Sequence, residues 1–474
     1  MSRVNLTGGA YRALSAAAAA QRCLNLYPEP LPQVQGEPIQ YVHYPTPGLN
    51  LWCNLFQTVR YLYVTSQGHL IAVSGQTVNL VKSDGTSSLL GRIQSGSGPC
   101  RMQDNGLVCV VVDGSANGWY FTVPTDGGDG YGQVTEISDP AFYGANTVAV
   151  LDTFFIFDDP KTNHWYVSPA NYAGNSTPFD SLYIASKTSY PDNVVGVTVL
   201  GQTIWIFGTQ TTELWYDAGA SDFPFQRIPS IIADQGCEAP YSIATNYGQV
   251  FWVGRDRSGH ARVYVGQANE TQAVSNFAIE QELNGYGDLS GTTGYTYQQD
   301  GHQFYVLTIP DVNKTWAYDA TTSLWHERCS YEGGAETRYR PNCFAAAYGK
   351  VFAGDYWYGR VYEVRTDALT ENGAPIKRQR AFPHFLTDGS RGIHRSLMLD
   401  MQNGDGQTIQ VDWSDDRGAT FISPISLPLG TTGNVWPTIW RLGMARDRIY
   451  RITWIDSAST ALLGAFIDLV PVRG

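Results

Sequence analysis

Charged residues are scarce in this sequence: Asp, Glu, Lys and Arg make up 16% of its 474 residues, against about 25% in an average soluble domain. No run of about 18 consecutive apolar residues occurs, so we expect no membrane-spanning helix. Basic residues number 31 and acidic residues 43, which gives a net charge of −12. Because a protein that grips duplex DNA by its phosphates should be basic, this balance argues against an ordinary DNA-binding protein.

Motifs for metal or cofactor chemistry are also missing. The seven cysteines include no Cys-x-x-Cys pair, which indicates reduced thiols that act as small hydrophobic side chains. The eight histidines show no His-x-x-x-His spacing, and no glycine-rich run precedes a helix as in a phosphate-binding loop. The acidic glycine-rich runs 126–130 and 403–406 are typical of tight turns. We therefore predict no metal and no cofactor.

Aromatic residues and glycine, by contrast, are abundant, with 13 Trp, 29 Tyr, 19 Phe and 49 Gly. This composition is typical of many short strands joined by tight turns. Tyr and Trp are also enriched in the cores of protein interfaces. The composition leaves open whether these rings lie between strands or against partner proteins.

A unit recurs seven times along the chain: a glycine or aspartate opens a short apolar strand, and a turn and a second apolar strand follow. The copies begin at Gly68, Gly106, Asp152, Gly201, Gly248, Gly301 and Gly349, a mean spacing of about 47 residues. Flanking apolar runs supply a first and a fourth strand, as a propeller blade requires. The sequence therefore predicts an all-β protein built on a β-propeller, with seven blades favoured and six possible if the first unit belongs to the N-terminal arm.

Two further regions flank the predicted propeller at residues 51–367. Residues 1–50 should form an extended arm, with a short helix over Ala13–Ala20. The proline-rich runs 27–32 and 44–48 cannot be central strands, because proline lacks the N–H donor, so we expect them to cross a surface or reach a neighbouring subunit. Residues 368–474 alternate apolar and polar residues, which predicts a C-terminal antiparallel β-sheet or sandwich.

One local motif lies in this C-terminal region. It fits the Asp-box hairpin known from sialidases and other propellers, and its residues are Ser414, Asp416, Gly418, Thr420 and Phe421. The aspartate should accept hydrogen bonds from turn amides, and the glycine should adopt a positive φ. We interpret this motif as a structural hairpin without a catalytic role.

A glycosidase would need two carboxylates about 5 to 10 Å apart, and a sialidase would need an arginine cluster with a tyrosine nucleophile. The candidates for such roles are Arg338, Arg340, Arg378, Arg380, Glu213 and Glu363. Nothing in the sequence brings these residues into one pocket. We therefore predict that the protein is not an enzyme.

Both ends of the chain resemble one known family. The run from Ala20 to Glu29, with Gly8–Tyr11 before it and Thr46–Leu49 after it, is similar to the opening of the tail-hub, or nozzle, proteins of short-tailed bacteriophages. These are also called packaged-DNA stabilisation proteins. The runs 413–418, 440–443, 445–448 and 451–454 resemble their closing domain, and the strands at 204–208 and 214–217 look similar too. The likeness spans nearly the whole chain.

The resemblance implies a structural virion protein of the tail, assembled in the host cytoplasm. Six copies would form a tube below the portal and the head-to-tail adaptor, and the tail needle would help to close it. The tube would retain the packaged double-stranded DNA and conduct it at ejection without sequence-specific binding. Tail fibres or spikes are further candidate partners. The family has no catalytic residues to carry over.

Two other classes of function remain open. A carbohydrate-binding propeller, acting as a receptor-recognition component of the tail, could stack sugars on exposed Trp and Tyr rings. A sialidase-like glycan depolymerase would instead hydrolyse a host polysaccharide through a carboxylate.

Overall fold

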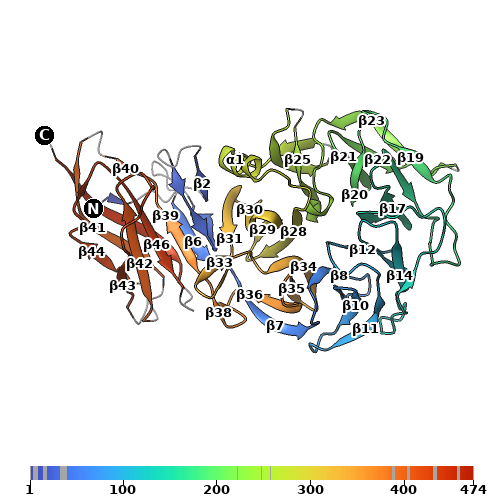
Figure 1. Ribbon diagram of the computed structural model, residues 1–474, viewed down its shortest axis with the longest axis horizontal. Helices are drawn as coiled ribbons and strands as arrows, with labels where there is room; N and C mark the ends of the chain where they lie inside the picture. Colours follow the sequence, from blue (N-terminus) through green and yellow to red (C-terminus); the bar gives the residue numbers. More distant parts are fainter. Residues whose placement is uncertain are drawn as a thin grey trace.

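Strands dominate the computed structural model, which describes residues 2–3, 9–13, 19–32, 40–220, 222–246, 248–256, 258–268, 270–386, 390–402, 406–430, 435–455 and 460–472. Figure 1 shows most of them in sheets around a central axis, with a smaller β domain at one side. The predicted all-β propeller with an N-terminal arm and a C-terminal antiparallel β domain is therefore confirmed.

Strand pairing in the described residues gives seven antiparallel units of four strands around the axis. In chain order the first five are β8 (Val59–Val64), β9 (Leu70–Ser74), β10 (Thr77–Val81) and β11 (Ser87–Arg92); β12 (Arg101–Asp104), β13 (Val108–Val112), β14 (Gly118–Thr122) and β15 (Thr135–Glu136); β16 (Val148–Leu151), β17 (Phe154–Asp158), β18 (His164–Val167) and β19 (Ile184–Ser186); β20 (Val194–Leu200), β21 (Thr203–Gly208), β22 (Thr212–Asp217) and β23 (Phe225–Ala233); and β24 (Ala244–Asn246), β25 (Gln249–Arg255), β26 (Ala261–Gln267) and β27 (Glu270–Ala273). The other two are β28 (Thr293–Gln299), β29 (His302–Ile309), β30 (Lys314–Asp319) and β31 (Leu324–Arg328), and β34 (Pro341–Ala347), β35 (Lys350–Asp355) and β36 (Arg360–Arg365) with β7 (Gly48–Asn54).

The repeated glycine or aspartate of each unit lies in the turn between the first and second strands. All seven of these residues have a positive φ, from 47° at Asp152 to 86° at Gly106. Six of them are glycine, which adopts this conformation without a steric penalty. An added Cβ would meet nothing within 4 Å at Gly68 or Gly201, so the turn conformation explains the repeat, and close packing does not.

The N-terminal arm supplies the fourth strand of the last unit. Strand β7 pairs with β36 over six residues, among them Leu51 with Tyr362 and Leu49 with Val364. The short strand β37 (Thr370–Glu371), which forms a hairpin with β38 (Ala374–Pro375), runs parallel to β7 on its other side. The ring is thus closed by residues that precede the propeller, and β7 crosses the boundary expected at residue 50.

The C-terminal domain consists of two sheets that include strands of the arm. One sheet has the order β44-β41-β47-β6-β5, with β1 on β47 and β45 on β41. Its strands are β1 (Ser2–Arg3), β5 (Leu26–Pro30), β6 (Tyr41–Pro45), β41 (Gly392–Met401), β44 (Thr438–Trp440), β45 (Met444–Ala445) and β47 (Leu462–Pro471). The other contains β39 (Arg378–Ala381), β40 (Phe385–Leu386), β42 (Thr408–Ser414), β43 (Ile425–Pro428) and β46 (Asp447–Trp454).

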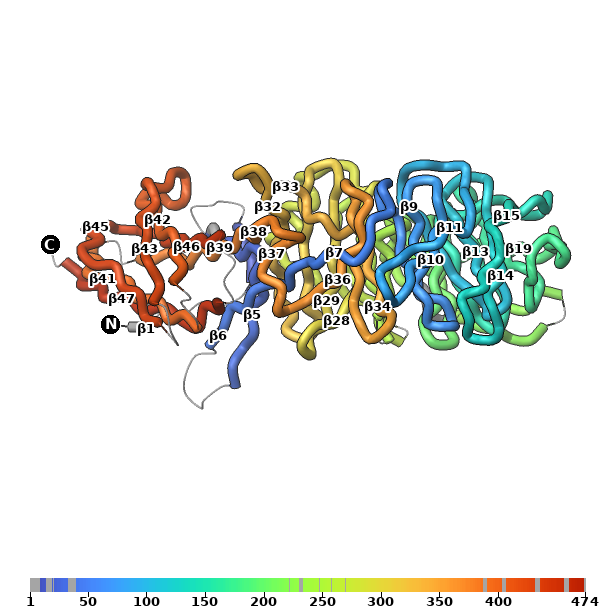
Figure 2. The backbone as a smooth tube through the Cα atoms, turned by 90° about the horizontal axis from the view of Figure 1, so that it is seen from below, coloured from blue at the N-terminus to red at the C-terminus, as the bar shows by residue number. Residues whose placement is uncertain are grey.

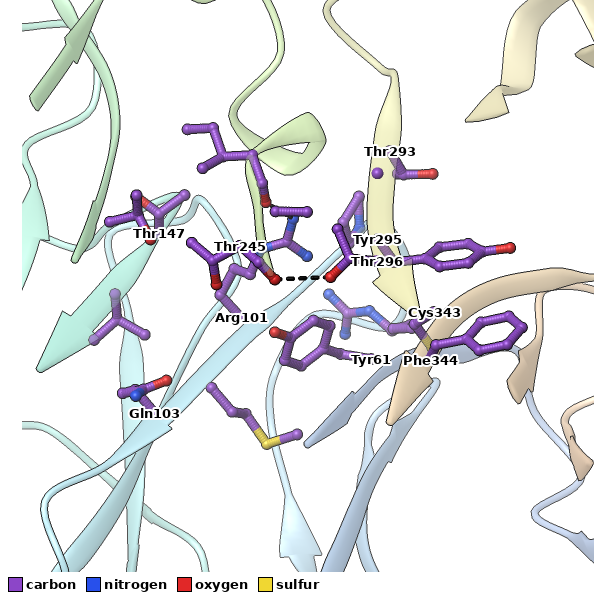
Figure 3. A pocket seen from close by; sticks show the side chains of 18 of the residues that line it. Tyr61, Arg101, Gln103, Thr147, Thr245, Thr293, Tyr295, Thr296, Cys343 and Phe344 are labelled. Carbon is purple, nitrogen blue, oxygen red and sulfur yellow. Dashed lines mark hydrogen bonds between the residues drawn. The ribbon is translucent and has the colours of Figure 1, made fainter. Parts of the chain in front are cut away.

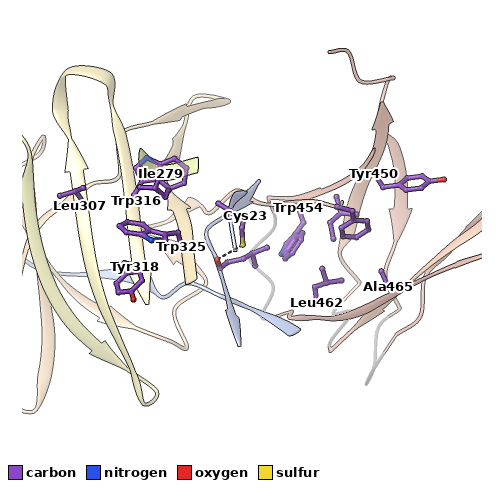
Figure 4. Packing of buried hydrophobic residues seen from close by; sticks show 14 of the residues in the cluster. Cys23, Ile279, Leu307, Trp316, Tyr318, Trp325, Tyr450, Trp454, Leu462 and Ala465 are labelled. Carbon is purple, nitrogen blue, oxygen red and sulfur yellow. Dashed lines mark hydrogen bonds between the residues drawn. The ribbon is translucent and has the colours of Figure 1, made fainter. Parts of the chain in front are cut away.

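This second sheet is continuous with the propeller. The arm strand β4 (Cys23–Leu24) pairs in parallel with β31 on one side and antiparallel with β39 on the other. The backbone tube in Figure 2 shows the arm between the ring and the C-terminal domain. One hydrophobic core runs through the junction, from Leu307 and Trp325 past Cys23 to Trp454 and Leu462 (Figure 4).

Two expectations for the arm need correction. Residues 14–18 of the expected helix 13–20 lie outside the described residues, but their flanks form a hairpin, in which β2 (Tyr11–Arg12) pairs with β3 (Ala20–Gln21). Strand β5 is at a sheet edge as expected, whereas β6 lies between β5 and β47. Proline is tolerated in β6 because Pro45 is its last residue, and β47 pairs only with His43.

Short elements complete the fold. The 3₁₀ turns are η1 (Pro240–Ser242) and η2 (Pro310–Val312), and β32 (Ser330–Glu332) pairs with β33 (Ala335–Thr337). Helix α1 (Phe277–Tyr286) was not predicted. Its start carries a recognisable signal, because the side chain of Asn276 accepts a hydrogen bond from the Ile279 N–H at 3.0 Å, as an N-cap does.

Candidate functional site

The innermost strands of all the propeller units meet at the axis. A cavity of about 200 Å³ lies on it, lined by residues of β8, β12, β16, β20, β24, β28 and β34 (Figure 3). This volume equals roughly seven water molecules of the liquid. A DNA duplex, whose major groove alone is about 12 Å wide, cannot pass through it.

Arg101 reaches across the axis. Its Nη2 donates hydrogen bonds to the carbonyls of Tyr241 at 2.6 Å and Ile243 at 3.2 Å, although Arg101 belongs to β12 and these residues precede β24. Its guanidinium also lies 5.1 Å from the centre of the Tyr61 ring. Because Arg101 already has carbonyl and aromatic partners, the axis is a bonded part of the core.

No carboxylate lines this cavity among the described residues, so the axis lacks the pair of acids that a glycosidase needs. The two acids considered from the sequence lie in different units. Glu213 on β22 is fully buried and accepts hydrogen bonds from Ser189 N–H at 2.7 Å and Trp215 Nε1 at 3.0 Å. Glu363 on β36 pairs with Lys350 at 2.6 Å. Both carboxylates have structural partners.

The four candidate arginines also have structural surroundings. Arg338 stacks on Tyr356 at 4.0 Å and donates to Asn342 at 2.6 Å. Arg340 forms an ion pair with Glu332. Arg378 is fully buried, and burial lowers its pKa to about 10. Arg380 donates to the Gly9 carbonyl at 2.9 Å, beneath the arm.

The Asp-box residues form a hydrogen-bonded turn after β42. Asp416 accepts from Ser414 Oγ at 2.6 Å, Thr420 Oγ1 at 2.6 Å and Thr420 N–H at 2.8 Å. Gly418 has a φ of 90° and donates its N–H to Ser414 Oγ at 2.7 Å. Hydrogen bonds from Ser414 and Thr420 lower the pKa of Asp416 to about 2. Phe421 stacks under the Arg451 guanidinium at 3.8 Å.

A second cavity of about 400 Å³ lies at the junction of the arm, α1, β31 and the Asp-box turn. Its lining combines apolar side chains with charged side chains of both signs. Arg22 donates to Glu327 at 2.7 and 2.8 Å and to Glu336 at 2.7 and 3.0 Å. Lys314 pairs with Glu327 at 2.6 Å, and Lys377 with Glu336 at 2.7 Å. We call Arg22, Lys314, Glu327, Glu336 and Lys377 the arm network.

Asn25 adds neutral hydrogen bonds to the same junction. It is buried with a φ of 51°, and its Nδ2 donates to the carbonyls of Cys329 at 2.9 Å and Lys377 at 2.8 Å. Arg22 and Asn25 both belong to the N-terminal run singled out in the sequence. Their roles were missed because their partners are more than 300 residues away in the chain.

The described residues hold neither a metal-binding cluster nor a membrane-spanning helix. Within the described ranges, no three His, Cys, Asp or Glu side chains gather where they could hold a metal ion. No helix in the described part of the chain has the length and apolarity to cross a membrane. The seven cysteines are free and buried, as the sequence predicts, and burial raises the pKa of Cys53 to about 12.

Comparison with solved structures finds matches at low similarity. The WD40 β-propeller domain of Doa1 is 12% identical with a TM-score of 0.39, and covers 67% of this chain and 97% of its own. The computationally designed Ika8 protein is 11% identical with a TM-score of 0.39, and the match covers 67% of this chain and 99% of that protein. An exo-β-1,3-galactanase from Phanerochaete chrysosporium is 9% identical with a TM-score of 0.32, and the match covers 84% of this chain and 100% of that enzyme. At these scores the likeness carries no argument about activity.

No curated protein matches this sequence. A family model does match, over residues 4–369, and its description is "Bacteriophage P22 Gp10, beta-propeller". The match covers the arm and all the propeller units, and it agrees with the observed fold. The chain therefore belongs to this phage stabilisation family and is a structural β-propeller protein of the phage tail.

Proposed function

We propose that this protein forms the tail hub, or nozzle, of a short-tailed phage: a homohexameric tube below the portal and head-to-tail adaptor. In this role it closes the DNA channel, retains the packaged genome and conducts it at ejection. The observation that carries the proposal is the family match over residues 4–369. The tail needle is the expected partner at the closed end, and fibres or spikes are further candidates.

The closed axis supports one geometric detail of this proposal. Because Arg101 bonds across the axis and the cavity there measures only about 200 Å³, DNA would pass between subunits and not through any single propeller. A net charge of −12 suits such a conduit, since acidic walls repel the DNA phosphates and prevent adhesion.

Exposed apolar side chains support extensive contacts in an assembly. Trp436 and Trp440 in the C-terminal domain are 59% and 61% exposed, and Phe56 and Trp357 near the ring closure are 83% and 69% exposed. Large exposed apolar groups of this kind are typical of contact surfaces. We propose that residues 51–367 and 368–474 enter the tube as two domains joined by the arm, without any enzymatic role, after assembly in the host cytoplasm.

The decisive test is to deplete the protein in the phage that encodes it and to count DNA-filled and empty heads by electron microscopy. The proposal expects heads that fill and then lose their genomes, with restoration by the wild-type protein supplied in trans. Heads that keep their DNA but fail to adsorb would instead indicate a receptor-binding component. Glycan-array binding and polysaccharide turnover by the purified protein test the two carbohydrate alternatives directly.

A further inference from the structure

Three buried hydrogen-bond donors without acceptors lie between the β28–β31 and β34–β36 sheets. They are Nη1 of Arg328 and the hydroxyls of Tyr295 and Tyr339, which donate to no described residue, although the Tyr339 hydroxyl also interacts with the Arg328 guanidinium as an acceptor. The side chains are almost fully enclosed, at 1%, 6% and 2% exposed. Buried donors of this kind are rare in folded proteins, because each loses its hydrogen bonds to water.

The three residues interact electrostatically with one another. The Arg328 guanidinium lies 5.7 Å from the centre of the Tyr339 ring and 5.4 Å from that of Phe304. Burial raises the pKa of Tyr295 and of Tyr339, and the charge of Arg328 opposes that rise in both. Tyr295 stacks on Phe344 with the ring centres 4.5 Å apart. Figure 3 shows both rings directed away from the axis, toward the space between β28 and β34.

No carboxylate bonded to Arg328 balances its charge in the described structure. Its Nε donates to Nε2 of His326 at 3.2 Å, and its Nη2 donates to the Tyr297 hydroxyl. Burial holds the pKa of His326 well below its ordinary value, so the imidazole is neutral.

The nearby acid Asp319 has other partners, because its Oδ2 binds His302 Nδ1 at 2.7 Å and Thr322 Oγ1 at 2.8 Å. Arg338 adds a second guanidinium, whose Nε also lacks a described partner. An isolated buried cation costs several kcal/mol unless a negative charge accompanies it. The local electrostatics therefore favour an anion.

We propose that a single halide ion, chloride under physiological conditions, binds between Arg328, Tyr295 and Tyr339 and holds these two sheets together. A monoatomic anion can accept from one guanidinium N–H and two phenol hydroxyls at once. This structural anion is independent of the proposed nozzle function.

Thermal unfolding of the full chain tests the site at constant ionic strength, with sodium chloride replaced stepwise by sodium gluconate. We expect Tm to rise by about 1 °C for each tenfold increase in chloride above the dissociation constant. The double variant Tyr295→Phe and Tyr339→Phe should lose this dependence. The matched control is Tyr172→Phe, which removes another buried and unpartnered hydroxyl from a different unit and should keep it. A wild type without chloride dependence, or a double variant that retains it, overturns the proposal.

Crystals of the full chain soaked in sodium bromide provide an independent readout. An anomalous peak within hydrogen-bonding distance of Arg328 Nη1 and both hydroxyls is the expected result. A peak-free site occupied by ordered water would overturn the proposal even if the double variant failed to fold.

Discussion

The arm makes two joints with the propeller, and they are built from different interactions. At the ring closure, β7 pairs with β36 over six residues, and the buried Leu49 packs with Ala353 and Tyr362. At the junction with the C-terminal domain, β4 contributes only two residues and a single parallel pair, Leu24 with Glu327. The arm network surrounds this second joint. Sheet pairing and apolar burial dominate the closure, whereas ion pairs contribute heavily to the junction.

This difference shows how one segment can hold two domains together. A long antiparallel pairing needs no charge, because its apolar residues exclude water. A two-residue strand buries little by itself, so bidentate ion pairs and the Asn25 hydrogen bonds supplement it. The two joints should therefore respond differently to deletion, charge removal and pH.

Deleting residues 1–54 should have the largest effect, because it removes both joints. The fully buried Val361, Tyr362 and Phe352 would lose cover at the ring closure, and the C-terminal sheets would lose β5 and β6. The expected loss exceeds the roughly 5–15 kcal/mol by which domains are stable, so we expect no soluble folded protein by circular dichroism. A deletion of residues 1–8 keeps β4 and β7 and should remain soluble; equal behaviour of the two deletions would contradict this account.

Arg22→Ala should weaken the junction and leave the closure intact. Removing one partner of a buried pair costs about 3 kcal/mol, and here Glu327 is 4% exposed. Urea unfolding of the full chain measures the loss. The control is Arg365→Ala, which breaks an exposed pair with Asp367 and should have no measurable effect.

The junction should also be sensitive to acid. Although burial opposes the shift, hydrogen bonds from Arg22 and Lys377 lower the pKa of Glu336 to about 2. A carboxyl group whose pKa is lower in the folded than in the unfolded chain stabilises the fold at pH values above its unfolded pKa. This stabilisation is lost as pH falls toward 2. Stability of the wild type should therefore decline below about pH 4.5, and the decline should be shallower in Arg22→Ala.

Glu371→Gln tests the opposite response at the closure. Glu371 lies beside Leu49 of β7, and burial raises its pKa to about 7. A carboxyl group whose pKa is higher in the folded than in the unfolded chain favours the folded state at low pH, where the group is protonated. This stabilisation is lost as pH rises through 7. Between pH 5 and 8 the wild type should lose on the order of 2 kcal/mol that the variant does not lose. The exposed variant Glu270→Gln should keep the wild-type slope.

Ser414→Ala should have the smallest effect, because the Asp-box turn borders the junction cavity but the Ser414 hydroxyl, among the described residues, bonds only within the turn. The substitution removes the hydroxyl that links Asp416 to Gly418. We expect a loss of about 1 kcal/mol with no change in phage titre. A lost titre with an unchanged Tm would show that the motif has a function beyond folding.

The sequence predicted what depends on local pattern and missed what depends on distant pairing. The turns at Gly68 and Asp152 were found because a positive φ restricts residue type, and the strand after each followed from its apolar run. Strand β4 has only two residues and no periodicity, so nothing local marks its pairing with β31 and β39. Arg101 was missed for a related reason, because its partners near β24 are about 140 residues away.

The position of β4 has a consequence for how the chain folds during synthesis. Cys23 and Leu24 leave the ribosome early, but their strand partners are Glu327 on one side and Gln379 and Arg380 on the other. Such distant contacts slow folding, because the entropy of closing a long loop is lost before the contact forms. Units such as β12–β15 can form from consecutive strands as they emerge. Strand β4 must wait unpaired until residues 378–381 have been made, so the two domains can be joined through it only late in synthesis.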